Sequence, residues 1–533
     1  MDFTIKIESI LGGHSALSHF SGEGQFKSSL GIDPAQPIND GTTNVSFVAS
    51  GLIRPAASEK FSGTTVTGAP MWFVPSPKDG LTYVFDSLGS VYSIGATFGS
   101  VTALGDLNDA GTAQGDGAEY YDNYVYFARS TTIARYGPLD GTPAFADDYW
   151  VGTLGKTRLT DNSNYPASFK SSVKYPRHVL HRHSDGKLYI ADVADNKGVI
   201  HYIATTKTTV EGDTDDNSTY NKVEVGYGLY PTAIESYGAD LAVAFYEGTN
   251  KSFRESRAKI AFWDTTSAKV NKIVWVEFPD QIITALKNIN GILYVVSGNI
   301  QSNGFRVSRF IGGYTFEEVM YSETGEPCFA GAIDGTGKRL LLGSFTDVPE
   351  TQPSVYSLGL QKTALGNGTF NVMGATGGST SAVHSLLVAD NDDFSFSVPI
   401  VGWTTGASGG TTNGIDKQGS SYGAPAEIWW SQVFRIGQPF KIKKIRFPLA
   451  QAIAANMVVV LSVYTDDGNG TTYELTEINN TNDSGKFNIV RRNDSNGNAI
   501  LGQHNFWLSL RFSGSALCVV GLPIEIIGET IDD

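Results

Sequence analysis

The stretch GAPMWFVPSPKDGLTYVFDSLGSVYSI, residues 68–94, decides the fold. It reads as three short apolar strands separated by a Lys-Asp-Gly turn and a Leu-Gly turn, because glycine tolerates the backbone angles that tight turns require. The stretch therefore predicts a small antiparallel meander. Similar units recur at residues 118–136, 176–203, 231–248, 281–299, 329–345 and 384–403.

The spacing of these units predicts how they assemble. The second strands are marked by Leu81, Tyr124, Lys187, Leu241, Ile292, Arg339 and Asp393. A period of about 40 to 50 residues with three or four short strands is typical of a β-propeller blade. A seven-stranded sandwich fits less well, because each interval holds several strands. We therefore expect an all-β protein with a seven-bladed β-propeller at residues 61–437; whether all seven units are complete blades stays open.

Residues 1–60 differ from the repeats. FTIKIESI alternates like one strand, and the Gly-, Ser- and Pro-rich segment after it predicts an extended N-terminal arm. Its Phe20 and Phe26 would dock either on the chain's own body or on a neighbouring subunit. A propeller must also close its ring, since an open ring leaves exposed strand edges. Residues 43–53 and 426–436 are the candidate closing strands.

Beyond Gly437 the strands become longer and lose the blade marker. They alternate in polarity and are separated by turns such as Asn496-Gly497. Residues 438–533 are therefore expected to form a C-terminal β-sandwich of jelly-roll type.

Composition excludes several classes of partner. The formal net charge of -15 over 533 residues argues against nucleic acid, which requires clustered Lys and Arg. Cys328 and Cys518 form neither a disulfide framework nor a CxxC motif. The N-terminus lacks a secretory signal, and the apolar run at residues 452–464 is too short to span about 30 Å of hydrocarbon. We expect a soluble protein made in a cytoplasm, without membrane insertion.

Metal and catalytic motifs are weak. His178, His181, His183 and His201 fall in one unit without a recognisable ligand spacing, so no metal site is predicted. The acidic stretches at residues 212–217, 390–393 and 465–470 supply oxygen atoms but do not match the EF-hand spacing. No cofactor is expected, and structural calcium is the one candidate that these stretches leave.

No catalytic residues are predicted, because the chain has no G-x-S-x-G, H-E-x-x-H or P-loop motif. We expect a protein that is not an enzyme. The alternatives are a propeller glycosidase or lyase with a carbohydrate-binding sandwich, and a non-catalytic lectin. The enzyme would place two or three carboxylates at the mouth of the propeller axis.

The candidate interaction residues are aromatic: Phe20, Phe26, Trp403, Trp429 and Trp430. Exposed aromatic rings stack on sugars and anchor interfaces, whereas buried rings pack between sheets. Alternation along a strand sends the rings of Trp429 and Trp430 to opposite faces.

The N-terminal residues carry a family resemblance. IESILGGHSALSHFSGEGQFKSSLGIDP, followed by SGLIRP, EKFSG and APMWFV, resembles the N-terminal region of virion structural proteins of tailed bacteriophages and related uncultured viral sequences. In those proteins an arm precedes a β-propeller-like body. The resemblance covers roughly the first 95 residues. It implies a tail or head-surface component of a virion, which assembles with copies of itself and other virion proteins and contacts a host surface glycan or protein. It brings no catalytic residues.

Overall fold

The chain is described from a computed structural model. The described residues are 1–8, 13–14, 25–30, 38–39, 44–45, 58–95, 98–107, 114–129, 132–151, 179–194, 197–204, 222–247, 257–270, 275–299, 304–322, 328–336, 339–343, 355–359, 381–389, 398–407, 410–418, 427–466, 471–514, 518 and 520–531.

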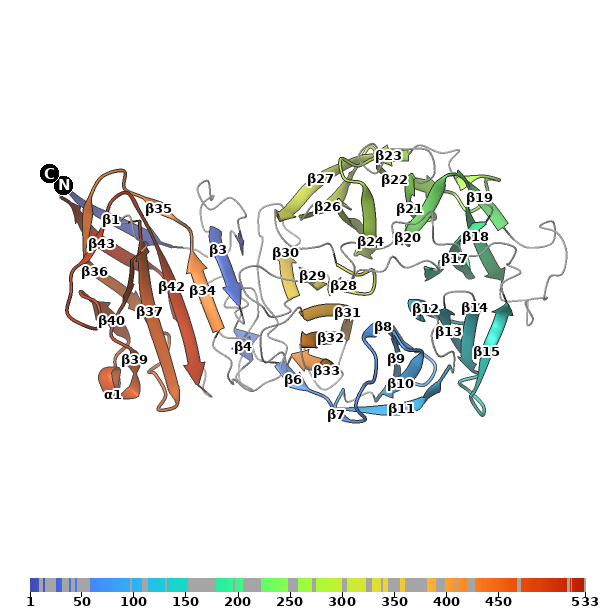
Figure 1. The fold of residues 1–533 in the computed structure, drawn as a ribbon, viewed down its shortest axis with the longest axis horizontal. Coiled ribbons are helices and arrows are strands. Elements are labelled where there is room, and N and C mark those ends of the chain that lie inside the picture. The colour runs from blue at the N-terminus through green and yellow to red at the C-terminus, as the bar shows by residue number, and fades with distance from the viewer. Residues whose placement is uncertain are drawn as a thin grey trace.

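Seven small antiparallel sheets surround a common axis and form a β-propeller (Figure 1). The first strand of each sheet contacts the first strand of the next, and the last sheet returns to the first. The strands of blades 1 to 3 are β8 (Pro70–Pro75), β9 (Thr82–Asp86), β10 (Ser90–Ile94) and β11 (Ser100–Asp106); β12 (Gln114–Tyr121), β13 (Tyr124–Arg129), β14 (Thr132–Gly137) and β15 (Ala144–Val151); and β16 (Leu180–Arg182), β17 (Lys187–Ala194), β18 (Lys197–Ala204) and β19 (Lys222–Tyr227).

Blades 4 to 7 continue the ring in chain order. Their strands are β20 (Leu229–Tyr237), β21 (Asp240–Glu247), β22 (Ala258–Trp263) and β23 (Trp275–Glu277); β24 (Ile282–Ile289), β25 (Ile292–Gly298), β26 (Phe305–Gly312) and β27 (Thr315–Ser322); β28 (Ile333–Thr336), β29 (Arg339–Gly343) and β30 (Val355–Gly359); and β31 (Ser381–Ala389), β32 (Val398–Ala407) and β33 (Gly410–Gln418). Blade 6 shows three strands within the described residues. The predicted all-β fold and propeller are confirmed.

The ring closes through residues that precede the first blade. Strand β6 (Ser58–Lys60) pairs antiparallel with β33 and supplies the outermost strand of blade 7, and β7 (Ser62–Gly63) then runs parallel to β11. Neither of the two predicted segments is the strand that closes the ring. Within residues 43–53, the structure describes only β5 (Asn44–Val45), which pairs with β4 (Ile38–Asn39). Residues 426–436 contribute strands to the sandwich and not to the ring.

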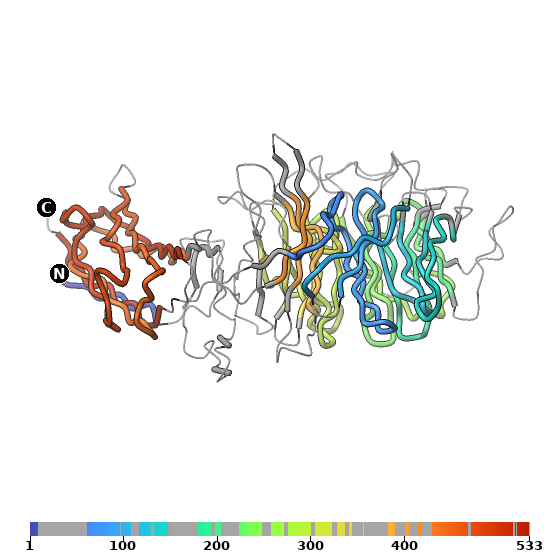
Figure 2. The backbone as a smooth tube through the Cα atoms, turned by 90° about the horizontal axis from the view of Figure 1, so that it is seen from below, coloured from blue at the N-terminus to red at the C-terminus, as the bar shows by residue number. Residues whose placement is uncertain are grey.

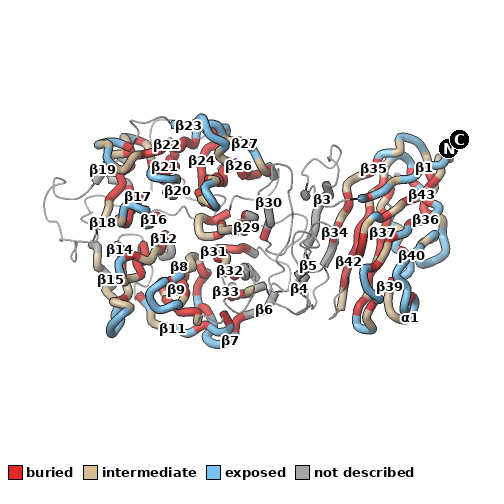
Figure 3. The backbone as a smooth tube through the Cα atoms, turned by 180° about the vertical axis from the view of Figure 1, so that it is seen from behind, coloured by how far each residue is buried: buried red, intermediate tan, exposed pale blue. Residues whose placement is uncertain are grey.

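Buried strands pack between neighbouring blades, as Figure 3 shows. Strand β22 is buried along its whole length, because both faces of a blade contact another blade. Its residues therefore show no polar alternation, and the one charged side chain among them, Lys259, is paired with Glu247 and Glu277. The apolar clusters bridge consecutive blades, for example Tyr189 of blade 3 with Phe245 and Trp263 of blade 4.

The second body is a β-sandwich. One sheet has the order β1 (Asp2–Ile7), β43 (Ile524–Thr530), β36 (Phe440–Pro448) and β40 (Asn488–Arg491), with β41 (Ile500–Gly502) also on β36. The other has the order β2 (Gly13–His14), β3 (Gln25–Leu30), β34 (Glu427–Ser431), β42 (Asn505–Gly514), β37 (Met457–Thr465) and β38 (Thr472–Glu474), with β35 (Phe434–Arg435) on β42 and β39 (Ile478–Asn479) on β37. The short helix α1 (Asn480–Asp483) follows β39.

The sandwich extends beyond the predicted range of 438–533. Its first strand, β1, comes from the start of the chain, and β34 lies between β3 and β42 in the other sheet. The first residues of the expected arm are therefore a regular strand of this body. Its core holds Trp429 together with Ile442, Leu510 and Ile526, so residues from both sides of position 438 share one apolar interior.

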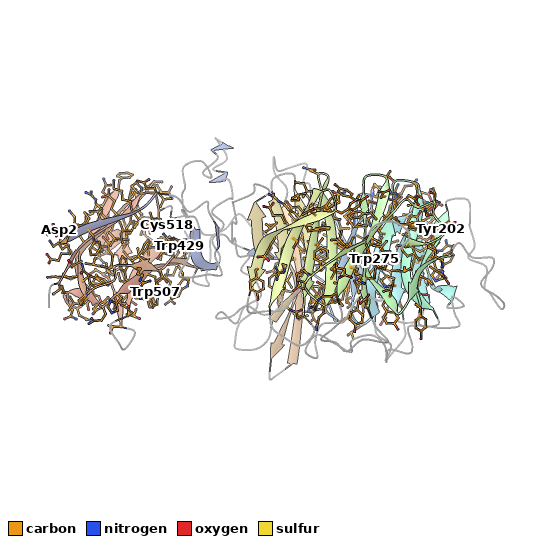
Figure 4. All side chains as sticks on the ribbon, turned by 90° about the horizontal axis from the view of Figure 1, so that it is seen from above. Asp2, Tyr202, Trp275, Trp429, Trp507 and Cys518 are labelled. Carbon is orange, nitrogen blue, oxygen red and sulfur yellow. The ribbon has the colours of Figure 1, made fainter. Side chains whose placement is uncertain are left out.

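The two bodies lie side by side (Figures 1 and 2). Both chain ends lie at the end of the sandwich away from the propeller, where the Met1 ammonium donates to Thr530 Oγ1 over 2.6 Å. Asp2 marks this end in Figure 4. Within the described ranges, no helix is long and apolar enough to cross a membrane.

Candidate functional site

The seven inner strands share one register position near their carboxyl ends. Blades 2, 4, 5 and 6 contribute Glu119, Glu235, Lys287 and Asp334 to this position. Each residue lies two positions before the end of its inner strand, where that strand forms its last pair with the second strand of the blade. The hydrogen bond from His183 N–H to the Lys187 carbonyl extends the pairing of blade 3, which gives His181 the same position.

A β-bulge provides a second reference for the same position. In blades 4 and 5 the bulge lies at Thr232 and Thr284, three residues before Glu235 and Lys287. The same bulge in blades 1 and 7 puts Val74 and Leu387 in register with them. We call this set the axial layer: Val74, Glu119, His181, Glu235, Lys287, Asp334 and Leu387.

Lys287 forms an ion pair within the axial layer that connects neighbouring blades. Its Nζ lies 3.0 Å from Asp334 Oδ1, which joins blades 5 and 6. Asp334 Oδ2 accepts the Val388 N–H over 2.8 Å, which extends the connection to blade 7. Burial opposes the charge of Lys287, but the carboxylates of Asp334 and Glu235 outweigh this effect and raise its pKa.

The pKa values of two glutamates in the axial layer lie near neutral pH. Burial raises the pKa of Glu119 to about 7 and that of Glu235 to about 7, while the nearby Lys287 charge acts in the opposite direction. Glu119 Oε1 accepts the Tyr120 N–H over 3.2 Å, and Glu235 Oε1 accepts the Ser236 N–H over 3.0 Å. Near neutral pH each carboxyl group is thus available both as an acid and as a base.

A directed hydrogen-bond chain lies behind Glu235. His183 Nε2 donates to the Ala239 carbonyl over 3.1 Å, so in the neutral ring Nδ1 accepts the Ser236 hydroxyl proton over 2.8 Å. Ser236 Oγ in turn accepts from His181 Nε2 over 2.6 Å. Burial lowers the pKa of His181 to about 3, which keeps that ring neutral as the chain requires. His181 Nε2 also lies 3.7 Å from Glu235 Oε1.

Water reaches this layer. The side chains of His181 and Glu235 are each 15% exposed, and that of Lys287 is 34% exposed, although all three belong to innermost strands. No group of three or more His, Cys, Asp and Glu side chains in the described residues is arranged to hold a metal ion. The layer therefore combines proton donors and acceptors that water can reach.

The four histidines that fall in one sequence unit do not come together in the described structure. His181 and His183 contact Ser236 across the interface of blades 3 and 4, whereas His201 Nε2 lies 3.1 Å from Asp192 within blade 3. His178 and the acidic stretches at residues 212–217 and 390–393 lie outside the described residues. Of residues 465–470, Thr465 and Asp466 are described, and Asp466 Oδ1 accepts the N–H groups of Gln503, His504 and Asn505.

The aromatic residues predicted to form interactions include buried and half-buried side chains. Trp403 is fully buried and donates to Asp416 Oδ1 over 2.9 Å, so it belongs to the core of blade 7. Trp429 is 1% exposed and packs in the sandwich core (Figure 4). These two assignments to an interaction surface are wrong, because both rings fill the interior of a body.

Trp430 points away from Trp429, as alternation predicts. Its ring centroid lies 4.8 Å from that of Tyr464, which stacks on Trp507 at an interplanar angle of 6°. These three half-buried rings lie on the outer face of the sheet that contains β34, β42 and β37. The main chain of Phe26 pairs with Ser431, and Phe20 lies outside the described residues.

The axial layer has no counterpart among the predicted site residues. Its ionisable members occur once per blade, about fifty residues apart, and no local motif joins them. Alignment of the units on their first turns would have brought Glu119, Glu235, Lys287 and Asp334 into one column. The enzyme alternative did predict carboxylates at the axis.

Comparisons with known proteins add the following. No protein-family model and no curated protein matches the chain. Among solved structures, it is similar to the β-propeller domain of Cps50 (Swd1) from Myceliophteria thermophila, at 10% identity and a TM-score of 0.41, over 67% of this chain and 99% of that chain. It is also similar to the WD40 domain of Pan2 from Neurospora crassa, at 10% identity and a TM-score of 0.40, over 67% of this chain and 90% of that chain. A third is the computationally designed Ika8 protein, at 11% identity and a TM-score of 0.35, over 70% of this chain and 97% of that chain.

Proposed function

We propose that this chain is a structural protein of a bacteriophage virion, a tail component that assembles with neighbouring subunits and contributes to host-surface contact. The observation that carries the proposal is the path of residues 1–60. Their strands β1 and β3 enter the sandwich, and their strand β6 closes the propeller. The segment with the phage resemblance thus contributes strands to both bodies and connects them. A protein that holds a projecting domain on a particle requires such a connection.

The position of the chain ends supports the sandwich as the attached body. Both ends lie at its far end, so the propeller projects from it (Figure 1). Strand β1 is at the edge of its sheet, and in the described part of the chain no strand pairs with its outer side. Such an edge can accept a strand from a neighbouring subunit.

The test is the assembly state of the purified full-length protein. Mass photometry and negative-stain microscopy should show rings or tubes. Thr4→Lys places a charge at an exposed position of the β1 edge and should dissociate them. The control Thr315→Lys, at an exposed position of β27 in the propeller, should leave them intact. A protein that stays monomeric across the accessible concentrations contradicts the proposal.

A carbohydrate-active propeller is the second candidate, and the axial layer favours it. Glu119 and Glu235 supply an acid and a base at one register position on blades 2 and 4, which is the pair of roles that glycoside cleavage uses. The test is release of reducing ends from a polysaccharide panel by the wild type, with Glu119→Gln and Glu235→Gln as inactive variants. A monomer that turns over glycan would replace the virion proposal.

A further inference from the structure

The hydroxyl group of Ser236 lies between two imidazole rings near the carboxyl end of inner strand β20. Its Oγ is 2.8 Å from His183 Nδ1 and 2.6 Å from His181 Nε2. Because His183 Nε2 donates to the Ala239 carbonyl over 3.1 Å, Nδ1 is the nitrogen that accepts the serine proton. A hydroxyl group, a base within hydrogen-bond reach and a third group that orients the base are the parts of an activated nucleophile.

Ser236 is held in place by contacts with both neighbouring blades. The two histidines come from blade 3, and Asn288 Nδ2 of blade 5 donates to the Ser236 carbonyl over 2.8 Å. On its own blade, the Ser236 N–H donates to Glu235 Oε1 over 3.0 Å. The hydroxyl oxygen therefore keeps a fixed position relative to its base, which is the pre-organisation that nucleophilic catalysis requires.

Solvent reaches the serine from the turn that follows it. Ser236 is partly exposed, and Gly238 and Ala239, which form the turn between β20 and β21, are exposed. The side chain of His181 beside it is 15% exposed. A substrate can approach Ser236 from this turn, and water can reach the same place for a hydrolysis.

A positive charge lies near the serine, where attack on a carbonyl carbon creates an oxyanion. Lys287 has the same register position as His181, on the other side of blade 4. Burial lowers the pKa of His181, and the charge of Lys287 adds to this effect. Lys287 is paired with Asp334 and its side chain is 34% exposed, so its ammonium group has further protons to donate to a substrate oxygen.

From this geometry, we infer that Ser236 is the nucleophile of an esterase site, with His183 as its general base. Ser236 Oγ attacks the carbonyl carbon of an ester while its proton passes to His183 Nδ1. The C–O bond to the leaving alcohol breaks, the alcohol takes the proton from His183, and an acyl group remains on Ser236. Water then gives a proton to the same nitrogen and attacks the acyl carbon. The bond to Ser236 Oγ breaks, the serine recovers its proton, and a carboxylic acid leaves.

The surroundings of the hydroxyl group favour a short acyl group. The side chains that contact Ser236 are the imidazoles of His181 and His183 and the carboxyl group of Glu235, and all of them are polar. A long acyl chain requires an apolar wall, whereas an acetyl group does not. The activity goes beyond both functions proposed above, because it requires neither a subunit interface nor an acid and a base on two different blades.

The probes are a fluorophosphonate, which labels activated serines covalently, and the p-nitrophenyl esters of acetate and decanoate, all applied to the full-length protein. Mass spectrometry of the digested protein should find the label on Ser236, and the acetate should be hydrolysed faster than the decanoate. Ser236→Ala should abolish both reactions. His183→Asn should slow them about 100-fold or more, the range for loss of a general base.

The matched control is Ser90→Ala. Ser90 is a half-buried serine of blade 1 whose hydroxyl lies 3.2 Å from Thr67 Oγ1 instead of an imidazole, so its loss should leave labelling and hydrolysis unchanged. If Ser236→Ala does not fold, the position of the label in the wild type decides, because that measurement needs no variant.

Four outcomes overturn the inference: no residue is labelled, the label is on a residue other than Ser236, the decanoate is hydrolysed faster than the acetate, or Ser236→Ala hydrolyses the acetate as fast as the wild type. Assembly and the release of reducing ends are measured separately. Failure of the esterase site therefore leaves the virion proposal and the second candidate untouched.

Discussion

The main-chain N–H of Phe61 donates to the carbonyl oxygen of Ile415 over 3.0 Å, directly after the strand that closes the propeller. This bond joins the residue before blade 1 to the last described strand of blade 7. Phe61 is 7% exposed and packs with Ile400 and Ile415, so the closure has a hydrophobic component as well as a strand pairing. The ring is thus held shut by a short segment that is distant in sequence from its partner.

Phe61→Ala should destabilise the propeller by about 3 to 5 kcal/mol, the usual cost of removing a buried phenylalanine ring. In a denaturant or thermal melt of this two-body protein, only the propeller transition should shift. The exposed neighbour Thr65 provides a matched control, and Thr65→Ala should shift neither transition. An unchanged propeller transition in Phe61→Ala would show that the ring closes without this contact.

Trp403→Phe should lower propeller stability by about 1.5 to 3 kcal/mol, the range for hydrogen bonds to charged groups. The reason is that the substitution removes the indole donor to Asp416 Oδ1 while Asp416 remains fully buried. Trp430→Phe is the comparison, because Trp430 is half-buried on the outer face of the sandwich and should leave the propeller transition in place. Equal shifts of that transition would contradict the assignment of Trp403 to the core.

The repeats were readable from sequence because each blade carries its own turn signals. Tyr124, Lys187, Ile292 and Arg339 start second strands as predicted, and Asp393 lies outside the described residues. The closing strand was missed, since Ser58–Lys60 has three residues and no alternation to detect.

Long-range pairing was the other part that local patterns could not supply. The alternation in FTIKIESI predicts a strand, but nothing in it identifies Ile526 as the partner of Ile5. Local sequence patterns could not predict the axial layer either. Glu119 and Glu235 acquire their shared position only when blades 2 and 4 stand in the same ring on either side of blade 3, and their raised pKa values follow from burial there.

Gly528→Ala should weaken the sandwich and release the first strand of the chain. A Cβ at this position would lie 2.3 Å from Phe3 Cζ and 2.7 Å from the Lys441 carbonyl oxygen, so β1 or β36 has to move. Overpacking of this kind costs about 1 to 3 kcal/mol. We expect a lower sandwich transition and faster hydrogen exchange in β1.

Gly99→Ala is the control for this substitution, because a Cβ there would meet nothing within 4 Å. It should leave both transitions and the exchange of β1 unchanged. If Gly528→Ala exchanged as slowly at β1 as the wild type does, the pairing of β1 with β43 would not describe the protein in solution.

The fragment 438–533 should not fold alone. It lacks β34, which lies between β3 and β42, and β1, which lies at the edge of the other sheet. It also lacks Trp429, one of the largest side chains of the sandwich core. Its amide NMR spectrum should have narrow dispersion, whereas residues 427–533 with a peptide of residues 1–30 added should gain dispersion. A well-dispersed spectrum of the shorter fragment would contradict the observed boundary.

The axial glutamates should make the propeller less stable as the pH rises. Their pKa values in the folded state are about 7, above the ordinary value of 4.5, so between these values the folded protein binds more protons than the unfolded chain. Stability then falls as the pH increases through this window. His181 acts in the opposite direction, because its pKa of about 3 lies below the ordinary 6.5, and its contribution is lost as the pH falls from 6.5 towards 3. Between pH 4.5 and 7 the two effects oppose each other, so the glutamate contribution is read from the difference between the wild type and a variant without these glutamates.

The double variant Glu119→Gln with Glu235→Gln should remove that decline. Its propeller transition, measured from pH 5 to 8, should gain on the wild type progressively with pH, since glutamine has no proton to lose. Glu277→Gln, whose side chain is 57% exposed on an outer strand, should run parallel to the wild type. A constant difference between the double variant and the wild type across this range would mean that neither glutamate titrates near 7, and that the axial layer holds both as ordinary ionised carboxylates.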